Sequence, residues 1–290
     1  MLRAIRARVA QSGGVLAFTA LCFASFNADA GNLWLTGHDM ELHCSGGSQC
    51  TNFGVALNFV RLGAPTKTLP VLVLDEGGEV AAAAGQALAK AKNTVEGAGN
   101  AYPLVVIAPS SAAFTTAVID TATYSAVVIA SDQNCGGCDN TAASIAAINA
   151  RTAALQAFFT AGGGLLYLAG AGTPGYYNSV PVPATAAPVA PPFVLTAAGL
   201  AAGLTLTDAN CCATHNSFNL PGAGSPLVVA ETDSAGLAET LFVSGGSICG
   251  GAICGGGGST NIPTMSEWGL ILMAGLLALS AFYFLRRRSR

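Results

Sequence analysis

Charge is scarce in this chain of 290 residues, and positive charge is the scarcest. Only 9% of the residues are Asp, Glu, Lys or Arg, and seven of the twelve basic residues lie before residue 9 or after residue 285. Between residues 31 and 261, five basic residues stand against thirteen acidic ones, a net charge of −8. Because phosphate binding needs clustered lysine and arginine, we expect no nucleic-acid partner for this section.

The sequence also lacks the short motifs of several enzyme classes. It contains no Gly-x-Ser-x-Gly turn, which an α/β-type serine hydrolase needs between strand and helix. It contains no Gly-x-x-x-x-Gly-Lys-Ser/Thr loop for phosphate binding either. We therefore assign no catalytic residue, no cofactor and no metal, and a non-catalytic protein is the favoured interpretation.

The first thirty residues have the parts of a signal peptide. Three arginines precede an apolar stretch over 15–26, and 28–30 read Ala-Asp-Ala, the small-x-small pattern of a signal peptidase site. The apolar core is shorter than the ~20 residues that span a bilayer as a helix. We expect signal peptidase to cleave after Ala30 and the chain that follows to be exported.

The other end of the chain, 262–290, predicts a membrane segment. An apolar run over 270–285 is followed by four arginines within the last five residues. Its sixteen residues would rise roughly 24 Å as a helix, which approaches the ~30 Å hydrocarbon core. Trp268 suits one membrane interface, and the arginines favour a cytoplasmic C-terminus.

The residues before this run carry a resemblance to a known signal. The motif consists of Ile262, Pro263, Thr264, Met265, Glu267 and Trp268, with Ser266 between. Followed by an apolar helix and an arginine cluster, it resembles the IPTL-CTERM sorting signal, a relative of the PEP-CTERM signals of Gram-negative bacteria, with Met265 in place of the usual Leu. The resemblance implies an inner-membrane intermediate, processing by an exosortase-type enzyme, and transfer to the cell envelope or outside. A permanent single-pass anchor is the alternative.

Cysteine usage agrees with export. Removal of Cys22 with the signal peptide leaves an even number, which in an oxidising compartment predicts four disulfides. The eight candidates are Cys44, Cys50, Cys135, Cys138, Cys211, Cys212, Cys249 and Cys254. Close spacing favours pairs within 44–50, 135–138 and 249–254, although eight cysteines allow 105 pairings. The 135–138 pair also has the spacing of a redox dithiol, but a structural clip is favoured.

The section from residue 31 to 244 predicts an exported α/β domain. Continuous apolar runs, typical of strands buried on both faces, occur at 32–35, 70–74, 104–108, 126–130 and 164–168. Helix-like stretches separate them at 53–62, 79–92 and 141–161. This alternation predicts a parallel sheet, with two late strands near 227–230 and 241–244 extending it. Residues 245–261 are mostly glycine and predict a flexible spacer.

Polar residues follow several of the predicted strands. In a parallel sheet the carboxyl ends of the strands share one edge, where ligands usually bind. We expect a binding rim there, formed by His38, Asp39, Asp75, Asp132 and Asp139. The alternative is that these residues satisfy ordinary turns and helix caps.

A second resemblance covers roughly residues 32–172. The strand order, with 149–152, 157–159 and 162–167, resembles the flavodoxin-like fold of class I glutamine amidotransferases and their ThuA-like relatives. The resemblance implies a nucleophilic Cys in a Gly-x-Cys-x-Gly turn or, in ThuA-like members, a His just after the glycine-rich strand. The corresponding residues 168–172 read Leu-Ala-Gly-Ala-Gly and contain neither. Catalytic roles therefore cannot be transferred.

Recognition or structure in the envelope is the predicted role of this domain. The alternative is an exported hydrolase or metal-dependent enzyme that uses His38, Asp39 and Asp132. His43 and His215 add two imidazoles to a possible ligand set for a transition metal.

Overall fold

The computed structural model describes residues 31–43, 48–62, 68–76, 103–132, 140–170, 173–205, 214–245, 247–249 and 252–254. The chain divides into two compact units, Met1–Gly255 and Gly256–Arg290, and every described residue belongs to the first. The expected signal peptide, the sorting segment and the helix expected at 79–92 lie outside the described residues. Within the described ranges no helix combines the length and the apolar character that crossing a membrane requires.

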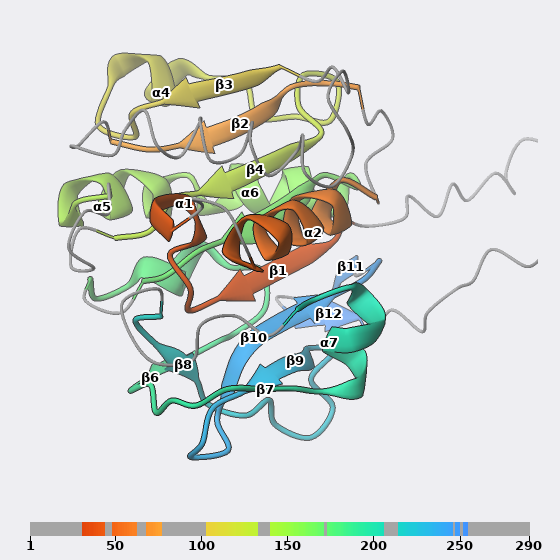
Figure 1. The fold of residues 1–290 in the computed structure, drawn as a ribbon. Helices are drawn as coiled ribbons and strands as arrows, with labels where there is room; N and C mark the ends of the chain where they lie inside the picture. Colours follow the sequence, from red (N-terminus) through yellow and green to blue (C-terminus); the bar gives the residue numbers. More distant parts are fainter. Residues whose placement is uncertain are drawn as a thin grey trace, which may run out of the picture. The chain divides into compact units, whose positions relative to one another are not determined.

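Five parallel strands form half of the main sheet (Figure 1). They are β1 (Leu33–Thr36), β2 (Val71–Leu74), β3 (Leu104–Ile107), β4 (Ala126–Ile129) and β5 (Gly164–Tyr167). Their order across the sheet is β3-β2-β4-β5-β1, and every neighbouring pair among them is parallel. The apolar runs therefore predicted both the strands and their parallel arrangement.

Later strands extend this sheet beyond β1; the two strands predicted near 227–230 and 241–244 are among them, and three others were not predicted. They are β6 (Ala186–Ala187), β7 (Val194–Leu195), β8 (Ser217–Phe218), β9 (Val228–Thr232) and β10 (Ala238–Val243). β10 runs antiparallel to β1, with Leu35 opposite Leu241, and also pairs with β8 and β9. The sheet is therefore mixed, and β1 lies where its parallel and antiparallel halves meet.

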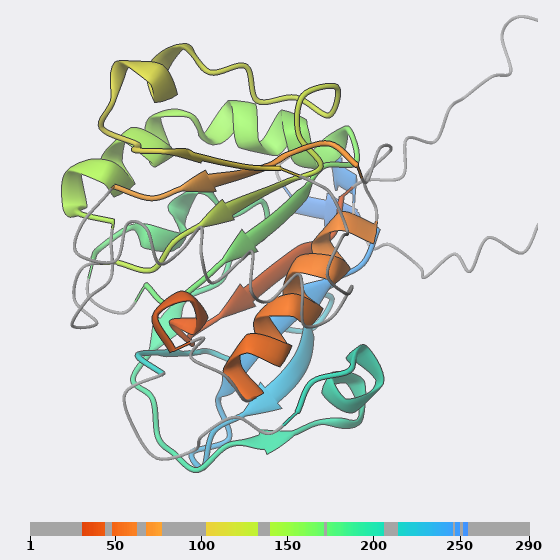
Figure 2. The ribbon, with the colours of Figure 1, turned by 45° about the horizontal axis from the view of Figure 1, so that its top comes forward.

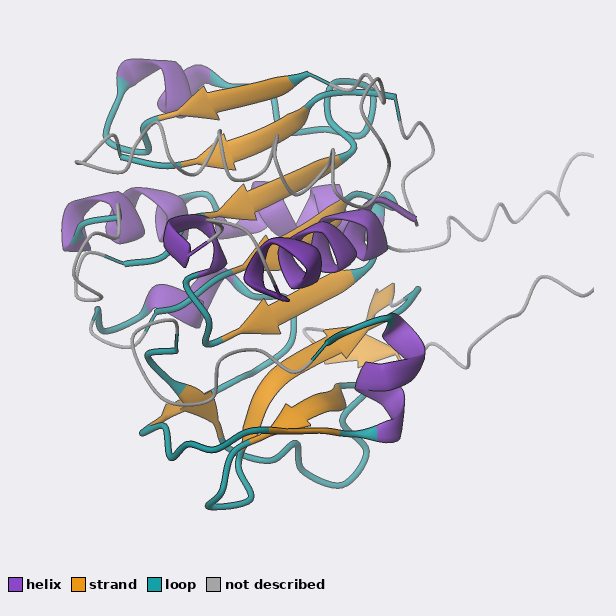
Figure 3. Ribbon diagram, in the orientation of Figure 1, coloured by secondary structure: helices purple, strands orange, loops and turns teal. Residues whose placement is uncertain are grey.

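Helices cover both faces of the parallel half (Figures 2 and 3). α1 (Met40–His43) and α2 (Ser48–Leu62) lie on one face, while α4 (Ala112–Thr116), α5 (Ala142–Ala150) and α6 (Thr152–Thr160) lie on the other. A 3-10 turn, η2 (Tyr176–Ser179), follows β5, and α7 (Ala197–Ala202) precedes β8. α2 begins five residues before the predicted start.

The single helix predicted over 141–161 is wrong, because the chain forms two helices there. Thr141 caps α5 in a capping box with Ser144. The break falls at Arg151, whose backbone leaves the helical region with φ −107° and ψ 17°. The Arg151 guanidinium donates to the Phe114 and Ala117 carbonyls at the end of α4. This tertiary contact accompanies a break that the apolar pattern alone does not reveal.

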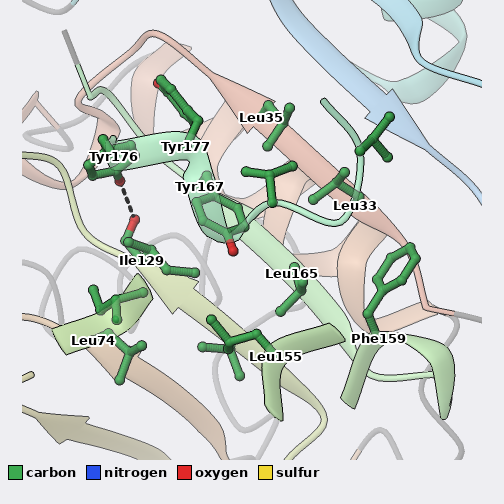
Figure 4. Packing of buried hydrophobic residues seen from close by; sticks show 14 of the residues in the cluster. Leu33, Leu35, Leu74, Ile129, Leu155, Phe159, Leu165, Tyr167, Tyr176 and Tyr177 are labelled. Carbon is green, nitrogen blue, oxygen red and sulfur yellow. Dashed lines mark hydrogen bonds between the residues drawn. The ribbon is translucent and has the colours of Figure 1, made fainter. Parts of the chain in front are cut away.

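Alternating strand residues build two buried clusters, one on each face of the sheet. Leu33, Leu35 and Leu165 pack with α5, α6 and η2, as the close-up in Figure 4 shows for part of this cluster. Trp34 and Leu166 point the other way and pack with α2. Burial on both faces explains why these strands are apolar throughout.

Two local expectations do not match the structure. β3 lies at the edge of the parallel half, and its four residues are only partly buried or exposed, whereas β1, β2, β4 and β5 are buried throughout. Part of the predicted glycine-rich spacer forms an antiparallel hairpin, β11 (Ser247–Cys249) and β12 (Ala252–Cys254). Its register places Cys249 opposite Ala252, and Cys254 opposite Ser247.

Candidate functional site

The residues expected to form an open rim are buried. His38, Asp39, Asp75 and Asp132 each expose at most 1% of their surface, and Asp139 lies outside the described residues. His38 and Asp39 follow β1, Asp75 follows β2, and Asp132 follows β4, so they do lie beyond the carboxyl ends of parallel strands. In place of an open rim the structure has a buried polar layer, in which the contacts of His38 and Asp39 reach into the antiparallel half.

His38 occupies the middle of this layer. Its Nε2 lies 2.9 Å from Glu231 Oε2 on β9 and 3.7 Å from Glu239 Oε1 on β10. Its Nδ1 lies 2.6 Å from Thr214 Oγ1, and the backbones of His38 and Thr214 form an isolated bridge. One imidazole therefore connects the end of β1 to three separate segments of the antiparallel half.

The two glutamates around His38 are themselves held by hydroxyl groups. Thr240 Oγ1 donates to Glu231 Oε2 at 3.3 Å, and Ser217 Oγ donates to Glu239 Oε2 at 3.2 Å. Burial, and then the charge of Glu231, raises the pKa of Glu239 well above its ordinary value. A proton on Glu239 lowers the cost of burying two carboxyl groups beside a single imidazole.

The other two histidines of the chain meet at Asp39. His215 Nε2 lies 3.1 Å from Asp39 Oδ2, and His43 Nε2 lies 3.5 Å from the same oxygen. The histidine side chains are 19% and 33% exposed, while that of Asp39 is fully buried. This contact joins α1 to the segment that leads into β8.

A further buried carboxyl group, Glu41, lies close to this layer. The Ser131 N–H donates to Glu41 Oε1 at 2.6 Å. Burial, together with the nearby Asp39, raises the pKa of Glu41 to about 8. Asp132 accepts a 2.6 Å hydrogen bond from the Thr173 N–H, so both carboxyl groups hold the backbone after β4 and β5 in place.

A buried side chain bridges the carboxyl ends of β2 and β4. From β2 the chain goes to β3 on one side of β2 and then to β4 on the other side. Open α/β sheets usually bind ligands where the strand order reverses in this way. Here the Asn140 amide donates to the Leu74 carbonyl at 3.0 Å and to the Ala130 carbonyl at 2.8 Å. Asn140 is fully buried, so these hydrogen bonds lie inside the protein and connect the two strand ends.

The described residues give no preformed metal centre. Among them no three His, Cys, Asp or Glu side chains are grouped in a way that holds a metal ion. His38 contacts Glu231 and Glu239, Asp39 contacts the other two histidines, and Asp132 contacts Thr173. Cys50 is disulfide-bonded, while the pairing of the eight cysteines stays a prediction.

The acidic residues with the most marked environments were not predicted as site residues. Glu41, Glu231 and Glu239 are buried, yet none was among the predicted rim residues. A signal was present, because residues 230–232 and 238–240 both read Ala-Glu-Thr beside apolar residues. An acidic residue within a buried strand needs a partner, and that requirement points to an interior polar cluster.

Comparison with known proteins finds a match at the C-terminal end only. Residues 260–288 match the family model of the IPTL-CTERM motif. No curated protein and no solved structure matches the chain. The match supports a C-terminal sorting signal of exported proteins, processed by an exosortase-type enzyme, and thus a secreted or envelope-associated protein.

Proposed function

We propose that this protein is exported by a cleaved signal peptide and sorted through its C-terminal signal to the cell envelope or the outside, where its α/β unit serves recognition or structure without catalysis. The match of residues 260–288 to the IPTL-CTERM motif carries the proposal. The N-terminal arginines and the Ala-Asp-Ala site agree with it, because they predict export of the same section.

The chain after β5 supports a non-catalytic role. In the enzymes that the sequence resembles, this is the place of a catalytic side chain. A Cβ atom built on Gly170 would lie 2.1 Å from Tyr176 Cδ1, so the position has no room for a side chain. The Tyr176 hydroxyl donates to the Ile129 and Ala130 carbonyls, which fixes the ring in that place (Figure 4).

We also propose that the parallel half of the sheet has the flavodoxin-like fold of the class I glutamine amidotransferases. With β2 counted as the first strand, the order β3-β2-β4-β5 reads 2-1-3-4, which is the beginning of the flavodoxin-like order. β1 and the antiparallel strands then add to the outer side of that core. A likeness in strand order supports a shared architecture but carries no activity with it.

Mass spectrometry of the mature protein tests the sorting part of the proposal. We expect an N-terminus at Gly31 and a C-terminus near Ile262, with the apolar segment removed. Pro263→Ala should leave the C-terminus uncut while the N-terminus is still processed. A native chain that keeps Arg290 in the envelope would instead identify a permanent anchor.

The alternative is an exported hydrolase or metal-dependent enzyme that uses His38, Asp39 and Asp132. Its residues are of the types that bind zinc and similar metals, but Asp39 and the two histidines that contact it are not grouped as a metal site in the described part of the chain. Metal analysis of the purified protein distinguishes the two proposals. A stoichiometric ion that is lost in His38→Ala supports the metal-dependent enzyme, and its absence weakens that alternative.

A further inference from the structure

Residues 214–217, which read Thr-His-Asn-Ser, form a short strap at the ends of two parallel strands. Beyond β1, the Gly37 carbonyl accepts a 2.9 Å hydrogen bond from the His215 N–H. Beyond β5, the Gly170 N–H donates to Asn216 Oδ1 at 3.0 Å. The strap therefore contacts both strands at the edge where α/β sheets usually bind ligands.

Every side chain of the strap makes a polar contact with the fold. The contacts are those of Thr214 with His38, His215 with Asp39, Asn216 with Tyr177, and Ser217 with both Asp233 and Glu239. His38 and Asp39 expose none of their surface beside these contacts. The strap thus helps to bury the two residues that follow β1.

The strap has no apolar side chain, so it can open without exposing apolar surface to water. Water satisfies the polar groups of an open segment, and the net loss per hydrogen bond is small. Phe218, the next residue, is fully buried in the apolar core and would be costly to expose. Local opening occurs where few apolar contacts hold a segment, so it should involve the strap and end at Phe218.

Glu239 links this opening to pH, because it is buried against the strap on β10. The ionisable groups that face it are His38 beyond β1, Glu231 on β9, Asp233 after β9 and Tyr177 on η2. One imidazole cannot neutralise three buried carboxylates, so the closed layer favours a proton on one of them. Burial, and then the charge of Glu231, raises the pKa of Glu239 well above its ordinary value of 4.5.

We propose that the strap opens locally about a hinge at Phe218, and that rising pH favours the open state. The closed strap keeps Glu239 dry and protonated, whereas the open strap admits the water that its carboxylate needs. Opening exposes His38 and Asp39 at the end of β1. The inference depends neither on sorting nor on the absence of catalysis, since it concerns only described residues of the exported section.

The three histidines of the chain provide the assay. Diethyl pyrocarbonate transfers an ethoxycarbonyl group to an accessible neutral imidazole, and mass spectrometry of peptides locates the group. His38 is fully buried, whereas the side chains of His43 and His215 are 33% and 19% exposed. In the full chain held in phosphatidylcholine nanodiscs, we expect slow modification of His38 at a rate that ~1 M urea leaves unchanged, because little surface opens. An unreactive His38, or a rate that rises with urea as steeply as global unfolding, would overturn the proposal.

Variants of the strap test which contacts hold it closed. Asn216→Ala removes the acceptor of two hydrogen bonds and should raise the rate of His38 relative to His43 roughly two- to twelvefold for each bond. Thr214→Val removes one contact and should raise the ratio by a smaller factor, which guards against a folding defect in the first variant. Asn219→Ala, at an exposed position beyond the hinge, is the matched control and should leave the ratio unchanged. Equal ratios in all three variants would overturn the assignment of the strap.

The dependence on pH tests the part played by Glu239. From about pH 7 to about pH 8, where most imidazoles are neutral, the ratio should rise about three- to tenfold, tenfold being the limit for the release of one proton. Glu239→Gln cannot ionise but still accepts from the Ser217 hydroxyl, so it should remove most of this rise, whereas Asp120→Asn should keep it. A constant ratio in the parent protein, or a rise that persists in Glu239→Gln, would overturn the role of the Glu239 proton.

Discussion

Glu41 shows how one buried carboxyl group makes stability depend on pH. Its pKa rises from 4.5 to about 8 in the folded protein, mainly because it is buried. Its contribution to stability is therefore fully present below pH 4.5 and is lost as the pH rises through about 8. Glu41→Gln retains an oxygen that can accept the Ser131 N–H but cannot ionise.

As the pH rises, we expect the unfolding free energy of Glu41→Gln to increase relative to that of the parent protein. The increase should be at most ~1.4 kcal/mol per pH unit between about pH 5 and about pH 8. Urea denaturation across that range measures it, with Asp120→Asn as the control for removal of a partly exposed carboxylate. A difference that stays constant with pH would contradict the assignment of Glu41.

Glu231 provides a second test at the scale of one residue. Glu231→Ala removes the acceptor of both the His38 imidazole and the Thr240 hydroxyl inside the protein. Because two buried groups then lose this acceptor, we expect a loss of about 2–4 kcal/mol in unfolding free energy. Glu231→Gln keeps an acceptor and should lose clearly less. Equal losses in the two variants would show that packing volume, rather than hydrogen bonding, is the main contribution.

At the scale of elements, β5 approaches α2 too closely for a side chain at Gly164. A Cβ there would lie 2.1 Å from the Val60 carbonyl oxygen, which is backbone and cannot rotate away. Gly164→Ala should therefore destabilise the protein by about 2 kcal/mol or more, since helix and strand must separate. Gly222→Ala is the matched control, because nothing lies within 4 Å of its Cβ. Thermal unfolding of the two variants tests this prediction. Similar melting temperatures would contradict the close approach of β5 to α2.

Arg151 couples α4 to the break between α5 and α6. Its guanidinium donates to two carbonyls near the end of α4 and lies 5.1 Å from the centre of the Phe114 ring. Arg151→Ala should cost about 1–3 kcal/mol and speed hydrogen exchange of the α4 amides more than those of α5. Arg151→Lys, which lacks the planar fork, should recover only part of the loss. Uniform exchange across both helices would argue against a specific clamp.

The elements also show what the sequence can predict. The runs at 71–74, 126–129 and 164–167 are apolar throughout because they are buried on both faces. The sequence therefore predicted that they form strands, that the strands are buried and that they pair in parallel. The helix break at Arg151 could not be predicted from the sequence, because the carbonyls that accept hydrogen bonds from Arg151 lie more than thirty residues away along the chain. The partners of His38 depend on the register of β9 and β10, which no local pattern specifies.

The described residues of the unit have an unusual distribution of charge. Seven of the nine acidic residues in the described ranges are buried, and the two others, Glu76 and Asp120, are only partly exposed. Every described residue that is fully exposed is uncharged. The predicted open rim assumed that polar residues after strands are exposed. Because most of the described acidic residues are buried, the structure has a buried polar layer there instead.

This distribution makes stability sensitive to pH and insensitive to salt. The contacts between histidines and acidic side chains among the described residues all involve a buried carboxyl group, and electrostatic interactions of buried groups are screened far less than those of exposed ones. Burial raises the pKa of both Glu41 and Glu239, so stability from these groups is present in acid and is lost as the pH rises.

We therefore expect the unfolding free energy to be higher near pH 5 than near pH 8. This difference should be several times larger than the change in unfolding free energy that added salt produces. Between about 0.05 and 0.5 M sodium chloride that change should stay within ~0.5 kcal/mol, because surface pairs contribute little. Urea denaturation, in which the denaturant carries no charge, measures both dependences on the same sample. A salt effect as large as the pH effect would show that exposed charges, rather than the buried layer, dominate the electrostatics of the fold.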